Sequence, residues 1–113
     1  MVKKPTIYLA GIQCSPGLDD KFNKWYNETH IPLLFKSEHV MSVTRYKLVP
    51  VIKGQNNPMY LTTYDFKDKK GVEAWFASPF MAAAVADTKK TWAEEGFDAP
   101  WQAVYEPITT WRK

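Results

Sequence analysis

The sequence has few of the residues on which nucleophilic, redox and metal chemistry depend, with one cysteine and two histidines in 113 residues. The lone Cys14 excludes an internal disulfide and is more typical of a small buried apolar residue than of a nucleophile. His30 and His39 are nine positions apart with Glu38 between them, a spacing that matches no recognised metal site. We therefore expect no bound metal, and the single thiol is consistent with a reducing compartment.

Long apolar runs and basic stripes are also missing. No run approaches the roughly 20 apolar residues that a membrane-spanning helix needs, and the N-terminal residues lack the apolar core of a signal peptide. The formal net charge is +3, but the lysines are scattered among acidic residues. The five glycines form no phosphate-binding loop. The pattern argues against membrane insertion and nucleic-acid binding, and it predicts a cytoplasmic protein.

Aromatic residues, in contrast, are abundant: 5 Trp, 6 Tyr and 6 Phe. A chain of this length buries only about two-thirds of the surface that its unfolded form exposes. So many large rings predict additional burial, either against a partner subunit or around an apolar pocket, unless they form an unusually aromatic core within one monomer.

Hydrophobic patterning and turn residues predict one domain over residues 1–113. Strands are expected at 6–14, 40–49, 59–66 and 101–111. The second and third strands are joined by the polar loop 53–58 and should form a hairpin. Pro107 removes a backbone donor from the last strand and predicts a bulge or a sheet edge there.

Capping residues place the helices between these strands. A first helix should be capped by Asp19 and Asp20 and run to residue 36 or so. A second helical stretch is expected at 68–77, and a third should begin at Ser78-Pro79 and end before Gly96. The order β-α-β-β-α-β predicts an α+β, ferredoxin-like fold, with two helices on one face of a four-stranded antiparallel sheet.

Neither face of the predicted sheet is polar. Strict alternation in the second strand puts on one face Val40, Ser42, Thr44, Tyr46 and Leu48. The helices can cover only one face, so the other needs a second cover, which another copy of the chain provides by sheet-to-sheet packing. The alternative is a monomer with an open aromatic sheet, as in some RNA-binding domains, but the third strand contains neither glycine nor a basic residue. We expect a homodimer.

The segment FNKWYNETHIP, residues 22–32, places a proline in an amphipathic helix. On a helical wheel Phe22 and Tyr26 belong to the apolar stripe, and His30 lies at its rim where helix and sheet meet. Pro32 cannot donate to the preceding turn and is expected to break the helix beside His30, which would open a cleft. The other interpretation is that Pro32 only bends the helix and that His30 is an ordinary half-buried histidine.

Four segments together resemble the EthD-like family of the dimeric α/β-barrel superfamily: FNKWYNETHIPLL, VTRYK, PMYLTTYDF and ASPFMAAAVADTKKTW. The residues that carry the resemblance are Phe22, Trp25, Tyr26, His30, Pro32, Arg45, Tyr46, Tyr64, Ser78, Pro79, Asp87 and Trp92. The resemblance implies a homodimer formed by sheet packing, with a hydrophobic pocket between sheet and helices in each subunit. Proteins of this kind include cofactor-free monooxygenases, isomerases, decarboxylating enzymes and members of no known activity.

The residues themselves favour acid-base chemistry. His30 can accept or release a proton near neutral pH, and Tyr26, one turn earlier, can donate a hydrogen bond to a substrate oxygen. Arg45 could bind a carboxylate or an enolate, or it could form a surface ion pair. The expected walls of the pocket are Phe22, Trp25, Tyr46, Tyr64, Trp75, Phe76, Met81, Val85 and Trp92.

These features predict a cofactor-independent enzyme that acts by proton transfer on a small apolar or aromatic molecule. The reaction could be isomerisation, decarboxylation or another elimination, or oxygenation. The alternative hypothesis is a non-catalytic homodimer that binds a hydrophobic ligand or serves in an assembly.

Overall fold

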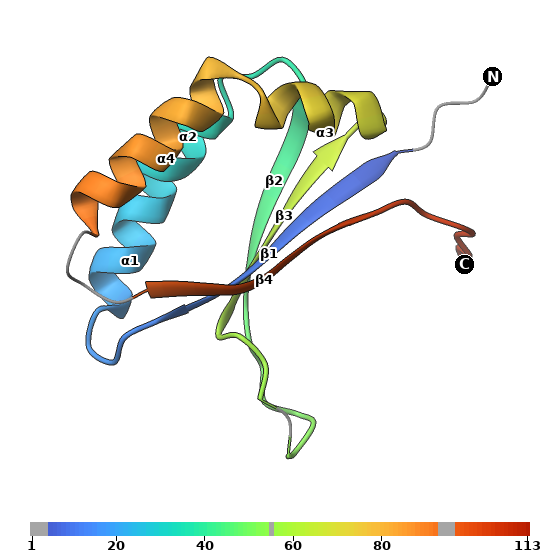
Figure 1. Ribbon diagram of the computed structural model, residues 1–113. Helices are drawn as coiled ribbons and strands as arrows, with labels where there is room; N and C mark the ends of the chain where they lie inside the picture. The colour runs from blue at the N-terminus through green and yellow to red at the C-terminus, as the bar shows by residue number, and fades with distance from the viewer. Residues whose placement is uncertain (1–4, 55, 93–96) are drawn as a thin grey trace.

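The computed structural model describes residues 5–54, 56–92 and 97–113. In chain order its elements are β1 (Thr6–Cys14), α1 (Asp19–Trp25), the π-helical η1 (Tyr26–His30), α2 (Ile31–Leu34), β2 (Val40–Lys47), β3 (Tyr60–Phe66), α3 (Lys69–Phe76), α4 (Pro79–Thr91) and β4 (Phe97–Tyr105). The strands form one sheet in the order β2-β3-β1-β4, in which every neighbouring pair is antiparallel. All helices lie on one side of this sheet (Figure 1). The predicted α+β, ferredoxin-like fold is confirmed.

The first helix continues through Pro32, so the expected break is wrong. The backbone from Tyr26 to His30 forms a π turn, closed by a hydrogen bond from the Ile31 N–H to the Tyr26 carbonyl. Pro32 follows immediately, in the first turn of α2. A π turn widens the helix, and such turns are rare inside α-helices and frequently lie at functional sites. The N-cap of α1 is Leu18 rather than an aspartate.

The other two predicted helix starts are confirmed. The Asp68 side chain caps α3 by accepting a hydrogen bond from the Gly71 N–H, and Ser78 caps α4 by accepting one from the Met81 N–H. Both helices therefore begin at positions that local chemistry determines. The predicted stop at Gly96 lies outside the described residues. None of the helices in the described part of the chain is long and apolar enough to cross a bilayer.

The edge strands differ from their predicted form. In β2 the register shifts between Val40 and Ser42, which is a β-bulge. Val40 therefore pairs with Phe66 and Val43 with Tyr64 on the helix-facing side, whereas strict alternation would have put Val40 on the opposite face. The last strand runs from 97 to 105 rather than from 101 to 111, and it ends before Pro107 because proline cannot donate to a ladder.

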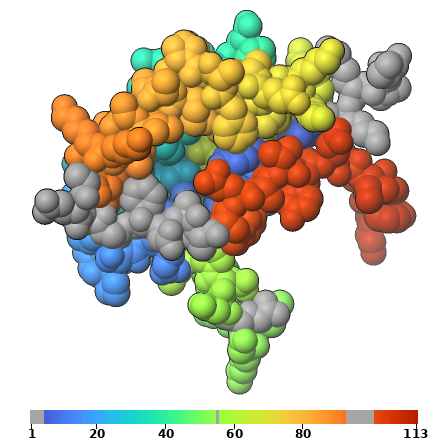
Figure 2. Space-filling view, viewed as in Figure 1, coloured from blue at the N-terminus to red at the C-terminus, as the bar shows by residue number. Residues whose placement is uncertain are grey.

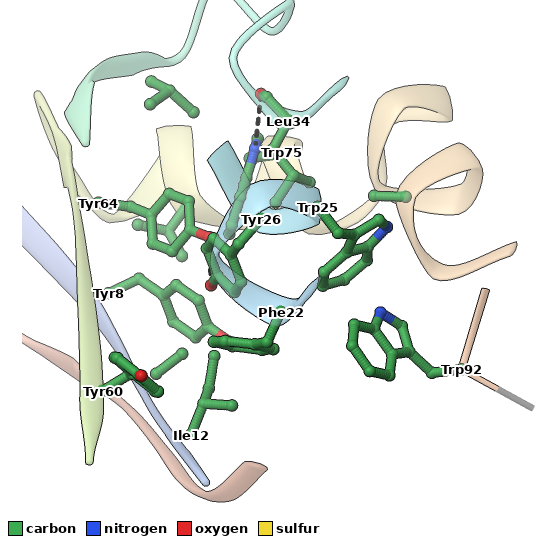
Figure 3. Close-up of a cluster of buried hydrophobic side chains, with 14 of the residues drawn as sticks. Tyr8, Ile12, Phe22, Trp25, Tyr26, Leu34, Tyr60, Tyr64, Trp75 and Trp92 are labelled. Carbon is green, nitrogen blue, oxygen red and sulfur yellow. Dashed lines mark hydrogen bonds between the residues drawn. The ribbon is translucent and has the colours of Figure 1, made fainter. Parts of the chain in front are cut away.

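Aromatic rings pack between the helices and the sheet (Figure 3). The largest fully buried side chains include Trp75, Tyr26, Tyr64, Phe22 and Phe66. Trp75 satisfies its polar atom by donating from Nε1 to the Leu34 carbonyl at 3.3 Å, which ties α3 to the end of the first helix. Much of the aromatic content of the sequence is thus core.

The opposite face of the sheet has no helix on it and carries large apolar side chains. Tyr46, Trp101 and Tyr105 are 51%, 40% and 59% exposed. The ring of Trp101 lies over β1 at Gly11. A Cβ atom added to Gly11 would lie 2.9 Å from the Trp101 ring and 2.9 Å from Pro58. The β2–β3 connection projects from this end of the sheet as an arm (Figure 1).

Substitution Gly11→Ala should lower the free energy of unfolding by about 1–3 kcal/mol, since the added methyl overlaps Trp101 and Pro58. Urea unfolding followed by circular dichroism measures the change. The matched control is Gly71→Ala, whose Cβ would meet its nearest neighbours at 3.7–3.8 Å in a helical backbone. It should be neutral or stabilising by up to about 1 kcal/mol. Equal effects of the two substitutions would contradict the close approach over Gly11.

Candidate functional site

A cavity of about 330 Å³ lies between the sheet and the helices. Figure 2 shows the hollow between α4 and β4. Its lining comes from β1, the first helix, β3, α3, α4 and β4: Tyr8, Ala10, Ile12, Trp25, Tyr26, His30, Leu34, Tyr64, Trp75, Phe76, Met81, Val85, Thr88 and Gln102. Its size and mostly apolar walls, with a few polar groups, are typical of a small-molecule site. No Asp, Glu, Lys or Arg is among the described residues that line it.

His30 is the titratable base in this lining, and aromatic rings hold it. The indole of Trp25 stacks on the imidazole with centroids 4.7 Å apart, and the Tyr26 ring meets it nearly edge-on at 4.8 Å. Tyr26 and His30 stand at the two ends of the π turn, and both line the cavity. The Nδ1 atom of His30 is buried and has no hydrogen-bond partner among the described residues. A buried unpaired polar atom is costly, and a role in catalysis is one of the reasons for which a protein retains one.

Burial lowers the pKa of His30 to about 4. Desolvation disfavours the imidazolium, and the nearby positive charge of Arg45 adds to this effect, whereas the negative charge of Asp87 opposes it. His30 is therefore neutral at physiological pH. In that state it can accept a proton.

Three tyrosine hydroxyls, with the side chains of Thr88 and Gln102, supply the other polar groups of the wall. Tyr26 and Tyr64 lie with their hydroxyl oxygens 3.1 Å apart, and Tyr8 donates to Gln102 Oε1 at 2.6 Å. Burial raises the pKa of all three tyrosines, so they are neutral hydrogen-bond donors at physiological pH. Together they can hydrogen-bond an oxygen atom of a bound molecule but cannot neutralise a full negative charge.

Arg45 lies outside the cavity, on the far side of Tyr26. Its guanidinium donates to Asn27 Oδ1 at 2.9 Å and to Asn23 Oδ1 at 2.8 Å, and it sits 4.5 Å above the Tyr26 ring centroid. This is a cation-π contact supported by two amide oxygens. The placement does not support the predicted contact of Arg45 with a substrate, nor the alternative of a surface ion pair.

Most of the predicted wall residues line the cavity: Trp25, Tyr64, Trp75, Phe76, Met81 and Val85. Three do not. Phe22 and Trp92 are buried in the core behind Trp25, with ring centroids 6.1 Å apart. Tyr46 lies on the open face of the sheet, because the bulge in β2 puts its neighbour Arg45 on the helix side.

Several lining residues were missed by the sequence analysis: Tyr8, Ala10, Ile12, Leu34, Thr88 and Gln102. The period-two pattern of β1 contains the signal for the first three, since Tyr8, Ala10 and Ile12 alternate with residues of the other face. Thr88 lies on the same helical face as Met81 and Val85. No local sequence pattern marks Gln102. It reaches the cavity because β4 pairs with β1, which places Gln102 beside Ala10.

The remaining candidates for chemistry lie elsewhere. Cys14 is buried and donates weakly to Asp19, and burial raises the pKa of its thiol, so it has the character of a structural cysteine. His39 is outside the cavity lining. In the part of the chain that the structure describes, no three His, Cys, Asp or Glu side chains cluster as metal ligands would.

Comparison with protein families gives one match: the model described as a domain of unknown function, DUF4286, matches residues 5–97. No curated protein matches the chain.

Solved structures with the same fold include enzymes. An EthD family protein from Bacillus halodurans is 16% identical, with 91% of this chain and 99% of that chain covered and a TM-score of 0.68. HapK from Hahella chejuensis is 10% identical over 96% and 97% of the two chains, with a TM-score of 0.68. SnoaB, a cofactor-independent oxygenase from Streptomyces nogalater, is 9% identical over 97% and 99%, with a TM-score of 0.66. At these identities the likeness concerns the fold alone, and the fold that the resemblance to EthD-like proteins implied is confirmed.

The lowered pKa of His30 makes stability depend on pH. Its value is 6.5 in an unfolded chain and about 4 in the folded one, so below pH 6.5 the unfolded state binds more protons and the folded state loses stability as the pH falls toward 4. His30→Gln removes this contribution. The unfolding free energy of the wild type minus that of the variant should therefore fall by about 2 kcal/mol between pH 7 and pH 4.5 in urea titrations. A difference that stays constant with pH would contradict the burial of a neutral imidazole.

Proposed function

This chain belongs to the DUF4286 family, whose function is unknown, and we propose that it is a cofactor-independent enzyme that transfers a proton on a small, neutral, apolar or aromatic molecule. His30 is the base, and Tyr26 with Tyr64 stabilises charge on an oxygen of the substrate. The observation that carries the proposal is the placement of a half-buried, neutral imidazole, whose Nδ1 has no hydrogen-bond partner among the described residues, in the wall of an otherwise uncharged cavity.

The proposed step begins with a substrate whose acidic C–H lies next to a carbonyl group. Because Nδ1 of His30 is buried, Nε2 is the nitrogen we assign to proton uptake. The electron pair of the broken C–H bond moves to the carbonyl oxygen, which becomes an enolate oxygen. Tyr26 and Tyr64 share one hydrogen bond, so one of their two hydroxyls remains to donate, and its hydrogen bond stabilises that oxygen more than the starting carbonyl. Return of the proton to another atom would be an isomerisation, and reaction of the carbanion with O₂ would be an oxygenation.

The uncharged wall narrows the substrate class. A carboxylate would lose its hydration on entering the cavity and would meet no cation there, since Arg45 is engaged by two asparagines behind Tyr26. Decarboxylation of a charged acid is therefore the least supported of the predicted reactions. A flat, neutral ketone or phenol fits the aromatic walls, because its ring can stack while its oxygen meets the tyrosines.

We also propose that two copies pack through the open faces of their sheets. Tyr46, Trp101 and Tyr105 leave a broad aromatic surface without a cover within the described monomer. A groove of about 360 Å³ lies on the same face at the base of the arm, bounded by Tyr46 and Trp101 among other residues. Exposed apolar patches of this kind are typical of interfaces, and a two-fold axis would let each face cover the other.

The enzyme proposal is tested by deuterium uptake from D₂O into 2-tetralone, a small neutral aromatic ketone with activated C–H bonds next to its carbonyl. The wild type should accelerate uptake, as measured by NMR. His30→Gln should lower the rate by about 10²-fold or more, because it removes the base and keeps a side chain of similar size. The control is His39→Gln, the same substitution at the histidine outside the cavity, which should exchange at the wild-type rate.

Two results would count against catalysis. Equal exchange by wild type and His30→Gln would exclude His30 as the base. Saturable binding of 2-tetralone without any exchange would support the alternative function, a non-catalytic protein that holds a hydrophobic ligand.

The dimer proposal is tested by Tyr46→Asp, which places a charge on the open face of the sheet. Sedimentation should show the wild type at twice the chain mass of 13.1 kDa and the variant shifted toward the monomer. Ala86→Asp, at an exposed position on α4, is the control and should sediment like the wild type. A wild type that sediments as a monomer at micromolar concentration would refute the proposal.

A further inference from the structure

The His30 ring is oriented by stacking rather than by hydrogen bonds. Catalytic histidines are commonly fixed through a hydrogen bond from one ring nitrogen to a carboxylate or carbonyl, but His30 has no such partner among the described residues. The indole of Trp25 lies against its face at an interplanar angle of 29°, and Tyr26 meets it at 62°. Whatever fixes the indole therefore also fixes the imidazole.

A carboxylate on α4 holds that indole. Trp25 Nε1 donates to Asp87 Oδ2 at 2.8 Å, and Thr91 Oγ1 donates to the other oxygen of Asp87 at 3.4 Å. The bond joins residues 62 positions apart and links the first helix to α4 beside the cavity. Asp87 itself is half-buried and does not line the cavity, so it acts on the site through Trp25.

Asp87 also acts on His30 through its charge. The other charged or titratable groups around the imidazole in the described chain are Arg45 from β2 and the hydroxyls of Tyr8, Tyr26 and Tyr64, which are neutral at physiological pH. Arg45 disfavours the imidazolium and Asp87 favours it. Asp87 is thus the anion that offsets part of the cost of creating a positive charge in this site.

We propose that Asp87 is a positioning residue for His30: it holds the indole on which the imidazole stacks, and its negative charge stabilises the imidazolium that forms when a proton is taken up. The inference rests on the proposed function, because proton uptake by His30 is the step that it assists. A helix–helix hydrogen bond with a structural role alone would not change the titration of His30.

The test compares the titration of the His30 ring, followed by NMR, in the wild type and in Asp87→Asn. The asparagine keeps an oxygen that can accept the indole N–H but removes the charge. Loss of the anion disfavours the protonated ring, so the midpoint should move to lower pH. In the 2-tetralone assay kcat should fall, by less than the roughly 10²-fold expected on removal of the imidazole, while KM stays near the wild-type value. The acidic limb of the pH profile should move in the same direction as the midpoint.

Further variants separate the two effects and keep the test decisive. Asp20→Asn, on the exposed first turn of α1, is the control and should leave the midpoint in place. Trp25→Phe keeps a ring and the Asp87 charge but removes the indole donor, so it should lower kcat through orientation. If Asp87→Asn does not fold, Asp87→Ser removes the charge and keeps a hydroxyl oxygen for the indole.

An unchanged midpoint in the folded charge-removing variant would overturn the inference. The titration needs no substrate, so its result is independent of the proposed function. If the wild type did not accelerate deuterium uptake into 2-tetralone, the enzyme proposal would be refuted. A shifted midpoint would still support the link from Asp87 to His30.

Discussion

The contact between the rings of Tyr26 and His30, at the two ends of the π turn, is the interaction on which the polar side of the cavity depends. The hydrogen bond from the Ile31 N–H to the Tyr26 carbonyl widens the helix by one residue, and the rings of Tyr26 and His30 lie 4.8 Å apart. Both then line the cavity, with the Tyr26 hydroxyl reaching Tyr64 in the sheet. The two side chains are four positions apart, so they share one side of the helix.

The charged residues near this site lie at its edges, outside the cavity lining. Arg45 packs on the ring of Tyr26 and donates to two asparagine oxygens, and Asp87 lies on the other side, against the indole of Trp25. The cavity between them is lined by rings, aliphatic groups and neutral donors. A low-polarity site strengthens each remaining electrostatic interaction. Small changes in these two flanking charges therefore act strongly on the imidazole.

The two faces of the sheet divide the aromatic content of the chain between two roles. On the helix side, rings such as Trp75 and Tyr64 fill the core and wall the cavity. On the open side, Trp101 lies across Gly11 against Pro58, and Tyr46 and Tyr105 remain exposed. From the composition alone, the rings could belong to the core, to a pocket or to an interface. In the fold, some rings form the core and the wall of the cavity, and the exposed rings form a surface suited to an interface.

The sequence by itself determined the element order, the antiparallel ferredoxin-like sheet and the starts of α3 and α4, because these depend on local periodicity and on caps such as Asp68 and Ser78. It also pointed to His30 and Tyr26. Only the tertiary structure decided that Arg45 lies behind Tyr26 and that Tyr46 lies on the open face, since both follow from a bulge in β2 that no local pattern marks. It likewise brought Gln102 and Asp87 to the site, because their neighbours there are far away in the chain and meet them only through strand pairing and helix packing.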